Sequence, residues 1–163
     1  MMKQYKLDFN SPIGIIEIVG SDTEVYSIMF SEQDQIVNVP QKDTPQVLLD
    51  CQQQLHEYFI GERHEFTFTY DFDGTNFQKE VWNALKSVTY GETATYKEIA
   101  VSIGNEKAVR AVGSANGKNN LSIVIPCHRI IGSNGTLTGY AGGMWRKEWL
   151  LQHEKLNSKG IKK

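Results

Sequence analysis

Cys127 is the residue whose neighbours point most directly to chemistry. It follows Pro126, which restricts the backbone, and it precedes His128 and Arg129. A cysteine reacts as its thiolate, and a neighbouring imidazole or positive charge lowers the pKa of the thiol toward neutrality. The sequence therefore predicts a nucleophilic cysteine at position 127.

Adjacency alone does not make Cys127 and His128 a catalytic pair. Neighbouring side chains of an extended strand point to opposite faces, so the two cooperate only if the chain turns at Pro126 or a water molecule bridges them. An inert buried cysteine beside a surface histidine is the alternative. Cys51, in contrast, lies on an apolar helical stripe, and we interpret it as a small buried hydrophobic residue.

Metal and nucleotide chemistry fit the sequence poorly. The two cysteines and four histidines form no Cys-x-x-Cys or His-x-x-x-His pair of the kind that holds zinc. The glycine-rich segment 139–143 is not followed by the Lys-Ser/Thr of a phosphate-binding loop. We expect no metal and no cofactor.

The composition indicates a globular protein that contacts no membrane. The chain has 163 residues, of which 40% are hydrophobic and 22% charged. Apolar runs such as 123–125 are far shorter than the ~20 residues that span a bilayer. The N-terminus shows no hydrophobic signal core, and two cysteines cannot form a secreted disulfide scaffold. We expect a cytoplasmic location.

Charge is distributed unevenly along the chain. Residues 1–76 contain 4 basic and 13 acidic residues, whereas residues 77–163 contain 13 basic and 6 acidic ones. These charges of -9 and +7 sum to the net charge of -2. A solvated surface explains such asymmetry as well, but the basic half favours an anionic partner.

The first half is typical of a small antiparallel sheet followed by a helix. Alternating or β-branched patterns predict strands at 5–9, 13–19, 25–30 and 66–70. Thr44 and Pro45 offer a cap and a first-turn proline for a helix that ends before Gly61. The break at 71–74 sets an N-terminal domain of residues 1–73.

The second half is predicted to be mainly helical. Thr75 with Gln78, and Thr95 with Glu98, have capping-box spacing and begin helices that end near 88 and 104. Asn105 is expected to cap a third helix through 116, which completes a helix-turn-helix. A strand at 123–125, a loop at 132–143 and a helix at 145–154 follow. The fold class is therefore α+β, with a second domain of residues 74–156 and a frayed tail of 157–163.

Several motifs in this second half resemble those of one family. They are Tyr90-Gly91-Glu92, Thr95-Tyr96, Arg110-Ala111-Val112-Gly113, Ile125-Pro126-Cys127-His128-Arg129-Ile130, Gly139-Tyr140-Ala141-Gly142-Gly143 and the segment 147–154. In this order they resemble the O6-alkylguanine alkyltransferases, the methylated-DNA–protein-cysteine methyltransferase family. The resemblance covers 77–154, about half of the chain.

The resemblance implies a reaction and a role for each matching residue. Such proteins bind duplex DNA, flip out a damaged guanine and move the alkyl group from its O6, and in some cases from O4-alkylthymine, irreversibly to the cysteine, here Cys127. His128 would act as base through a water molecule and Glu154 would orient it. Tyr96 would donate a proton to the departing base, and Lys147 would lie near the site.

The resemblance also implies a DNA surface and a base pocket. Arg110 would enter the stack that the flipped base leaves, in the minor groove. The expected DNA-binding residues are Arg110, Ala108, Ala111, Gly113, Ser114, Arg129 and Tyr140. The expected pocket residues are Asn119, Tyr140, Ala141 and Gly142. The partner would be double-stranded DNA containing O6-alkylguanine, bound by a monomer.

Two departures and two rival functions stay open at this point. Asn120 stands where the family usually has proline, and Ala141 stands where some members have serine. One rival is a module that binds the lesion without transfer, although such relatives replace the cysteine. The other is a thiol hydrolase with turnover that uses Cys127, His128 and Glu154.

Overall fold

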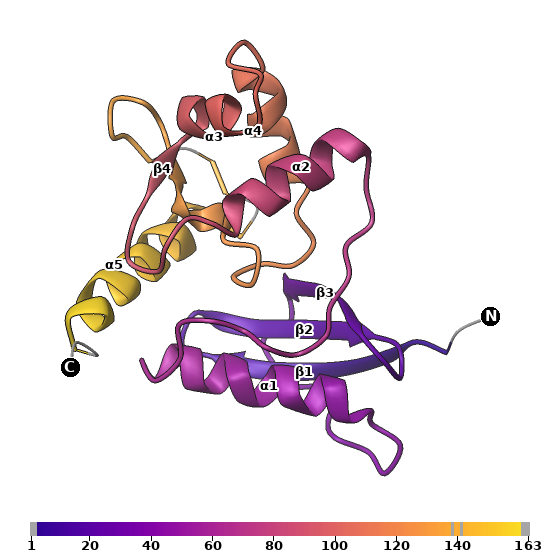
Figure 1. Cartoon of the computed structure of the whole chain (residues 1–163). Helices are drawn as coiled ribbons and strands as arrows, with labels where there is room; N and C mark the ends of the chain where they lie inside the picture. Colours follow the sequence, from indigo (N-terminus) through magenta and orange to yellow (C-terminus); the bar gives the residue numbers. More distant parts are fainter. Residues whose placement is uncertain (1–2, 138, 141, 161–163) are drawn as a thin grey trace. The chain divides into compact units, whose positions relative to one another are not determined.

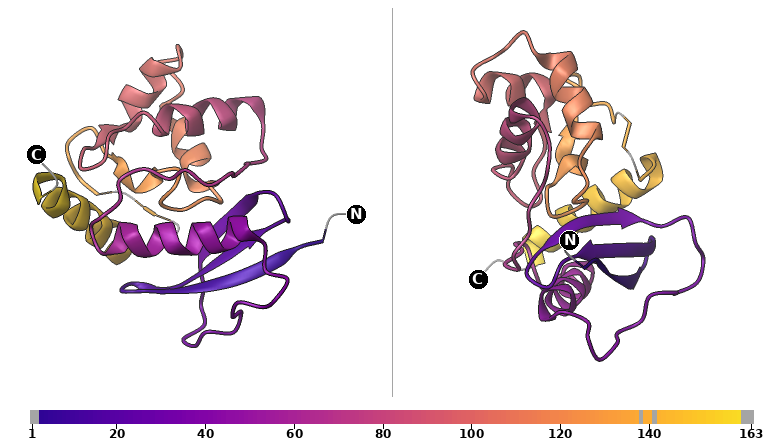
Figure 2. Two further views of the ribbon diagram at one scale, coloured as in Figure 1. Left: turned by 60° about the horizontal axis from the view of Figure 1, so that its bottom comes forward. Right: turned by 90° about the vertical axis from the view of Figure 1, so that its right-hand side faces the viewer.

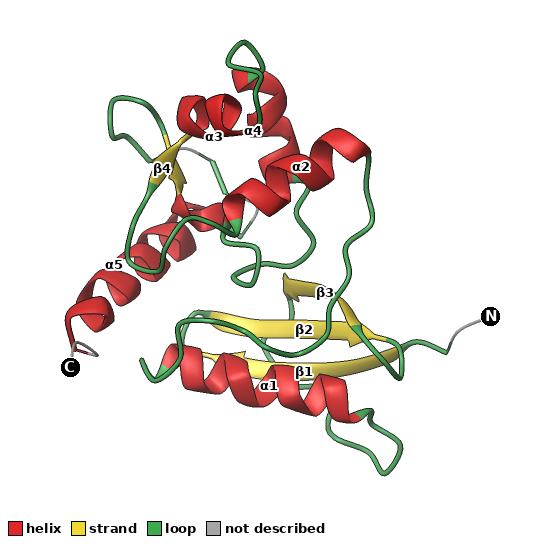
Figure 3. Cartoon of the chain, viewed as in Figure 1, coloured by secondary structure: helices red, strands yellow, loops and turns green. Residues whose placement is uncertain are grey.

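The computed structural model describes residues 3–137, 139–140 and 142–160, and only the backbone of residues 159 and 160. The chain divides into two compact units. The first runs to Phe72 and includes Asn120–Ser122, and the second takes up the chain from Asp73 with the exception of those three residues. Figure 3 shows that the longer strands lie in the first unit and most helices in the second.

The first unit is an antiparallel sheet covered by one helix. Strands β1 (Tyr5–Ser11), β2 (Gly14–Gly20) and β3 (Val25–Phe30) pair in the order β1-β2-β3. Helix α1 (Gln46–Phe59) runs along one face of this sheet (Figures 1 and 2). Apolar side chains from both layers are fully buried, and they include Leu7, Ile16, Ile18, Leu48, Cys51 and Leu55. The interpretation of Cys51 as a buried hydrophobic residue agrees with this placement.

Two predictions for the first unit are wrong. Residues 66–70 form no strand, because only an isolated bridge joins Tyr70 to Val25. The Gln54 amide of α1 instead binds Thr67, accepting from its backbone N–H at 2.9 Å and donating to its hydroxyl at 2.8 Å. Thr44 does not cap α1, since its hydroxyl accepts from Gln41 N at 2.7 Å.

In its described residues the second unit forms four α-helices, two two-residue strands and a 3-10 turn. In chain order these are α2 (Asn76–Leu85), β4 (Ala94–Thr95), α3 (Tyr96–Ser102), α4 (Val109–Gly117), the turn η1 (Cys127–Arg129), β5 (Ile130–Ile131) and α5 (Met144–Gly160). Both expected capping boxes are present, from Thr75 to Gln78 and from Thr95 to Glu98. These local signals therefore position α2 and α3 correctly.

Helices α3 and α4 pack together as the helix-turn-helix (Figure 1). The second helix begins later than predicted, because Asn105 does not cap it. The Asn105 carbonyl accepts from Ala108 N at 3.0 Å within the connecting turn, and Ala108 is the N-cap residue of α4, without a side-chain hydrogen bond.

Three other boundaries differ from the sequence predictions. Residues 123–125 form a turn in which Ile123 has a φ of 74°. The preceding residues 120–122 already pair with β3 through Asn120 O and Ser122 N, so the chain must change direction immediately afterwards. Helix α2 ends at Leu85 and not near 88. Helix α5 continues to Gly160, whereas the tail was expected to fray from 157; residues 161–163 lie outside the described residues.

The fold class is nevertheless the predicted one. A small antiparallel sheet with one helix precedes a mainly helical unit that carries a helix-turn-helix. Within the described ranges, no helix combines the length and apolar character that a membrane crossing requires.

Candidate active site

Cys127 and His128 lie in the turn η1 and not on an extended strand, so their side chains need not point to opposite faces. The chain leaves Pro126 and forms a 3-10 turn over Cys127–Arg129, so these side chains do not alternate as they would on a strand. Strand β5 follows at once and pairs in parallel with β4, the two residues that precede Tyr96. The pairing therefore fixes the reactive turn next to the start of α3.

The Cys127 thiol is buried and hydrogen-bonded. Asn119 Nδ2 donates to Sγ at 3.3 Å and to Ile125 O at 2.8 Å, which holds the amide in one orientation. Burial raises the pKa of the Cys127 thiol, while the Asn119 hydrogen bond and the charge of Lys147 oppose that rise. The expectation of a lowered thiol pKa is thus wrong for the resting protein, because desolvation outweighs the neighbouring positive charge.

His128 and Glu154 form a buried pair. Their Nε2 and Oε2 atoms lie 2.7 Å apart, and both side chains are essentially inaccessible. Burial lowers the pKa of His128, although Glu154 opposes this, so the imidazole is neutral near pH 7. A neutral ring that faces a carboxylate donates from Nε2, which leaves the lone pair on Nδ1.

Arg129 is part of this site and does not lie on the surface. Its Nε and Nη2 donate to the two Glu154 oxygens at 2.8 and 3.1 Å, and its Nη1 donates to Val88 O at 2.6 Å. Burial alone would raise the pKa of Glu154, but His128 and Arg129 reverse the effect and hold that pKa well below its usual range. An arginine so enclosed is not placed to contact DNA, and we correct that expectation.

Lys147 reaches the same region from α5. Its side chain is fully buried, and Nζ donates to Ile130 O. Burial lowers the pKa of Lys147, and the proximity of Cys127 opposes this. The four residues Cys127, His128, Lys147 and Glu154 thus meet in one site, as the family resemblance implies.

The helix-turn-helix presents three of the seven expected DNA-binding residues to solvent. Arg110, Ala111 and Ser114 on α4 are exposed, whereas Val112 and Ala115 on the same helix are buried. The Tyr96 ring packs beside Gly113, where an added Cβ would lie 3.7 Å from Tyr96 Cε1. A helix that is buried on one side therefore exposes small residues and one arginine on the other.

The loop before α5 carries the remaining expected pocket residues. Tyr140 O accepts from Gly143 N at 2.8 Å, and Gly142 O accepts from Arg146 Nη1 at 2.9 Å. These bonds fix the end of the loop against the first turn of α5, the helix that carries Lys147. Ala141 lies outside the described residues.

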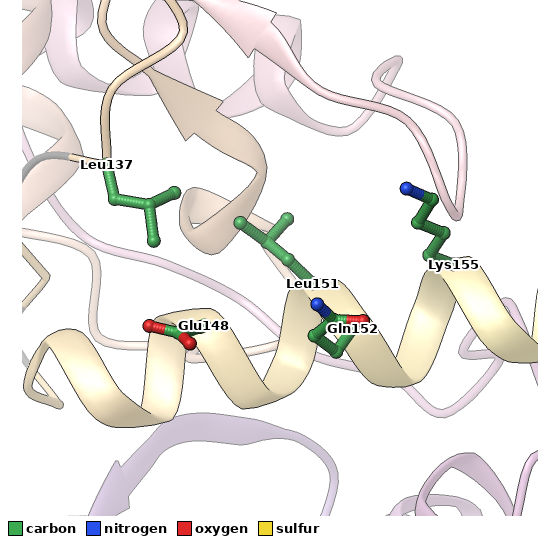
Figure 4. Close-up of a pocket in the computed structure, with 5 residues that line it drawn as sticks. All are labelled: Leu137, Glu148, Leu151, Gln152 and Lys155. Carbon is green, nitrogen blue, oxygen red and sulfur yellow. The ribbon is translucent and has the colours of Figure 1, made fainter.

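A small pocket lies elsewhere on α5 (Figure 4). Its volume is ≈ 190 Å³, and its lining residues are Leu137, Glu148, Leu151, Gln152 and Lys155. None of them belongs to the site around Cys127. Among the residues that the structure describes, no group of three or more His, Cys, Asp or Glu side chains is arranged to hold a metal ion.

Two residues of the site were not found from the sequence. Asn116 on α4 donates from Nδ2 to Cys127 O at 3.4 Å. Gly91, which follows Tyr90, donates from its backbone N–H to Glu154 Oε1 at 3.3 Å. The spacing of Asn116 and Asn119, three residues apart at the end of a helix, was a signal for the first contact. The second depends on long-range folding alone.

Family models cover both units of the chain. The model described as "6-O-methylguanine DNA methyltransferase, DNA binding domain" matches residues 76–156. The model described as "6-O-methylguanine DNA methyltransferase, ribonuclease-like domain" matches residues 5–72.

Full-length relatives agree with these matches. A methylated-DNA–protein-cysteine methyltransferase of Methanosarcina acetivorans is 46% identical and covers 92% of this chain and 97% of its own. The constitutive one of Bacillus subtilis is 41% identical, with 95% and 98% covered. A crystal structure of Mycobacterium tuberculosis O6-methylguanine methyltransferase superposes with a TM-score of 0.84 at 40% identity, over 95% of this chain and 94% of that one. The chain belongs to the 6-O-methylguanine DNA methyltransferase family.

Proposed function

We propose that this protein repairs DNA by transferring the alkyl group of O6-alkylguanine in a duplex to its own Cys127. The observation that carries the proposal is the buried thiol, which Asn119 holds at 3.3 Å beside a His128–Glu154 pair of 2.7 Å. Family membership supports the reaction, and a related Mycobacterium tuberculosis protein, 42% identical with a TM-score of 0.84 over 94% of both chains, has been solved in complex with DNA.

The proposed step is a single displacement at the alkyl carbon. The thiol proton passes through a water molecule to His128 Nδ1, and Glu154 stabilises the imidazolium that forms. The sulfur then forms a bond to the alkyl carbon as the bond from that carbon to guanine O6 breaks. Tyr96 donates a proton to the departing base. Because a raised thiol pKa disfavours the resting thiolate, the base must act during the reaction.

Access to O6 requires extrusion of the base from the stack. Unstacking costs a few kcal/mol and is easiest for a mispaired or damaged base. We propose that Arg110 fills the gap, because it is exposed on a helix face of small residues that can approach the minor groove closely. Ala108, Ala111, Gly113 and Ser114 would lie along the DNA, and Asn119, Tyr140 and Gly142 would line the base pocket.

The product is a thioether, which water does not hydrolyse. Each molecule would therefore act once, without a cofactor and as a monomer on DNA. We propose O6-alkylguanine as the principal substrate and O4-alkylthymine as a secondary one.

Mass spectrometry after incubation with O6-methylguanine duplex tests the proposal. We expect one adduct of about 14 Da, mapped to Cys127, and none in Cys127→Ser. Cys51→Ala is the matched control and should keep the adduct, because Cys51 is buried in the other unit. Binding without an adduct would favour a lesion-binding module, and turnover with unmodified protein would favour a hydrolase. Either result contradicts the proposal.

A further inference from the structure

Two buried acceptors beside Cys127 lack a hydrogen-bond partner among the described residues. They are Asn116 Oδ1 and His128 Nδ1. Asn116 is 6% exposed and His128 is 0% exposed, so bulk water does not reach either side chain freely. A buried polar atom without a partner costs free energy, and such atoms in folded proteins call for a structural reason.

The partners of the other polar atoms explain why these two are acceptors. Asn116 Nδ2 donates to Cys127 O at 3.4 Å, so the amide oxygen is the atom left over. His128 Nε2 faces Glu154 at 2.7 Å, so Nδ1 carries the lone pair. Asn116 is hydrogen-bonded to the turn η1 through the Cys127 carbonyl. His128 is itself a residue of that turn.

A donor with two hydrogens satisfies two acceptors, and water is the smallest such group. A thiol has one hydrogen and can serve only one of them. We propose that Asn116 is a positioning residue for the alkyl transfer, whose Oδ1 and His128 Nδ1 together hold the water that carries the thiol proton. This inference rests on the proposed function.

The proton balance follows from this arrangement. The water accepts the Cys127 proton on its oxygen and releases one of its own hydrogens to His128 Nδ1, which gives a thiolate and an imidazolium. The remaining hydrogen stays bonded to Asn116 Oδ1 and fixes the orientation of the water throughout. After the sulfur takes the alkyl group, Tyr96 protonates the departing guanine. Tyr96 regains a proton from solvent, to which the His128 imidazolium releases the proton that the thiol lost.

The proposal predicts a changed pH dependence when the Asn116 amide is removed. The groups that act on the thiol are Asn119 after α4 and Lys147 of α5. The groups that act on His128, the base in the same turn, are Glu154, Arg129 and Lys147. All of them remain in Asn116→Leu, which keeps the branched shape of the side chain, with somewhat more volume, and lacks the amide. A poorly held water weakens the base, so the thiolate should form only at higher pH.

The experiment measures two rates. The first is the rate at which iodoacetamide labels Cys127 between pH 6 and 10, with the label located by peptide mapping. The second is the rate of methyl transfer from O6-methylguanine duplex. We expect the midpoint of labelling to rise by about one pH unit in Asn116→Leu, which is a tenfold lower rate near pH 7. Methyl transfer should slow by about the same factor. Asn116→Ala removes the same oxygen without added bulk, and it decides the matter if the leucine variant does not fold.

Asn157→Leu is the matched control, because its amide also donates to a backbone carbonyl, His153 O at 2.8 Å, but within α5. A purely structural role for Asn116 would lower the rates at every pH and leave the midpoint unmoved. That result, or an equal shift in the control, overturns the inference. If the wild-type protein takes no methyl group from DNA, the proposed function fails instead, whatever the labelling midpoints are.

Discussion

The Glu154 carboxylate is ionised although its burial favours the neutral form. Two guanidinium nitrogens of Arg129, the Gly91 amide and His128 Nε2 surround its carboxylate. Arginine stays protonated at any ordinary pH, so this ion pair keeps Glu154 ionised and thereby fixes which nitrogen of His128 is free to act as base. The arginine in the Pro-Cys-His-Arg motif therefore serves the reaction indirectly.

Arg129→Met should destabilise the protein by about 3–5 kcal/mol at pH 7, because it leaves a buried carboxylate without its cation. The Glu154 pKa in the folded protein lies below its ordinary value of 4.5, and that of His128 lies below 6.5. Each lowered pKa contributes stability above the ordinary value, and this contribution is lost as the pH falls. The free energy of unfolding of the wild type should therefore decrease from about pH 6.5 downward. The difference in this free energy between wild type and Arg129→Met should narrow as Glu154 of the variant, which has lost its cation, becomes protonated.

Urea unfolding at pH 7, 5.5 and 4 measures both quantities. Arg63→Met is the matched control, since Arg63 pairs with Glu57 at 2.7 Å but with both side chains more than a quarter exposed. This variant should lose little stability at any of these pH values. A gap between Arg129→Met and wild type that stays constant with pH would show that the ion pair does not set the ionisation of Glu154.

At the scale of elements, the segment 88–91 connects α2 to the site. Val88 O and Gly91 N both bind residues of the reactive centre. Gly91 has a φ of 84°, and a Cβ added there would lie 2.8 Å from Ser158 Cβ on α5. Gly104, in the turn of the helix-turn-helix, has a φ of 79° and nothing within 4 Å of an added Cβ. A side chain at Gly104 would therefore introduce backbone strain alone, whereas one at Gly91 would introduce backbone strain and a steric clash.

Gly91→Ala should destabilise the protein more than Gly104→Ala. The left-handed backbone costs an alanine about 1–2 kcal/mol at either position, and only Gly91→Ala adds the clash with Ser158. The same clash should displace the Gly91 amide from Glu154 and slow alkyl transfer. Thermal unfolding and transfer rates of both variants are the measurements. Equal losses of stability in the two variants would contradict this prediction, because they would mean that α5 shifts away from the new side chain without a cost in free energy.

Elements that begin at a short-range motif, such as a capping box, could be predicted from the sequence. Features that depend on contacts between distant residues could not. The capping boxes at Thr75 and Thr95 involve residues three apart, so the sequence alone positions α2 and α3. Residues 66–70 alternate as a strand would, yet the α1 side chain Gln54 takes their backbone hydrogen bond. Arg129 follows Cys127 in a basic half, which favoured a DNA contact, and only folding brings Glu154 to it.

At the scale of the whole molecule, the two halves of the chain carry opposite charge. The first 76 residues hold an excess of nine acidic side chains, whereas the later residues hold an excess of seven basic ones. Arg110 on α4 and Lys107 in the turn before it are exposed members of that basic half. Contacts of such residues with phosphates release counterions and weaken with salt, whereas insertion of a side chain into the base stack does not.

Arg110→Ala and Lys107→Ala should therefore affect different steps: the first the transfer rate, the second the affinity for DNA. Lys107→Ala should weaken duplex binding and make the dependence of affinity on salt shallower, with an unchanged transfer rate once DNA is saturating. Arg110→Ala should slow transfer at saturating duplex by about tenfold, because the extruded base is no longer replaced in the stack. Neither variant should slow reaction with free O6-benzylguanine, which needs no extrusion. Equal slowing of the free base by Arg110→Ala would assign that residue to the reactive site, and would leave the helix-turn-helix with charge attraction as its only contribution.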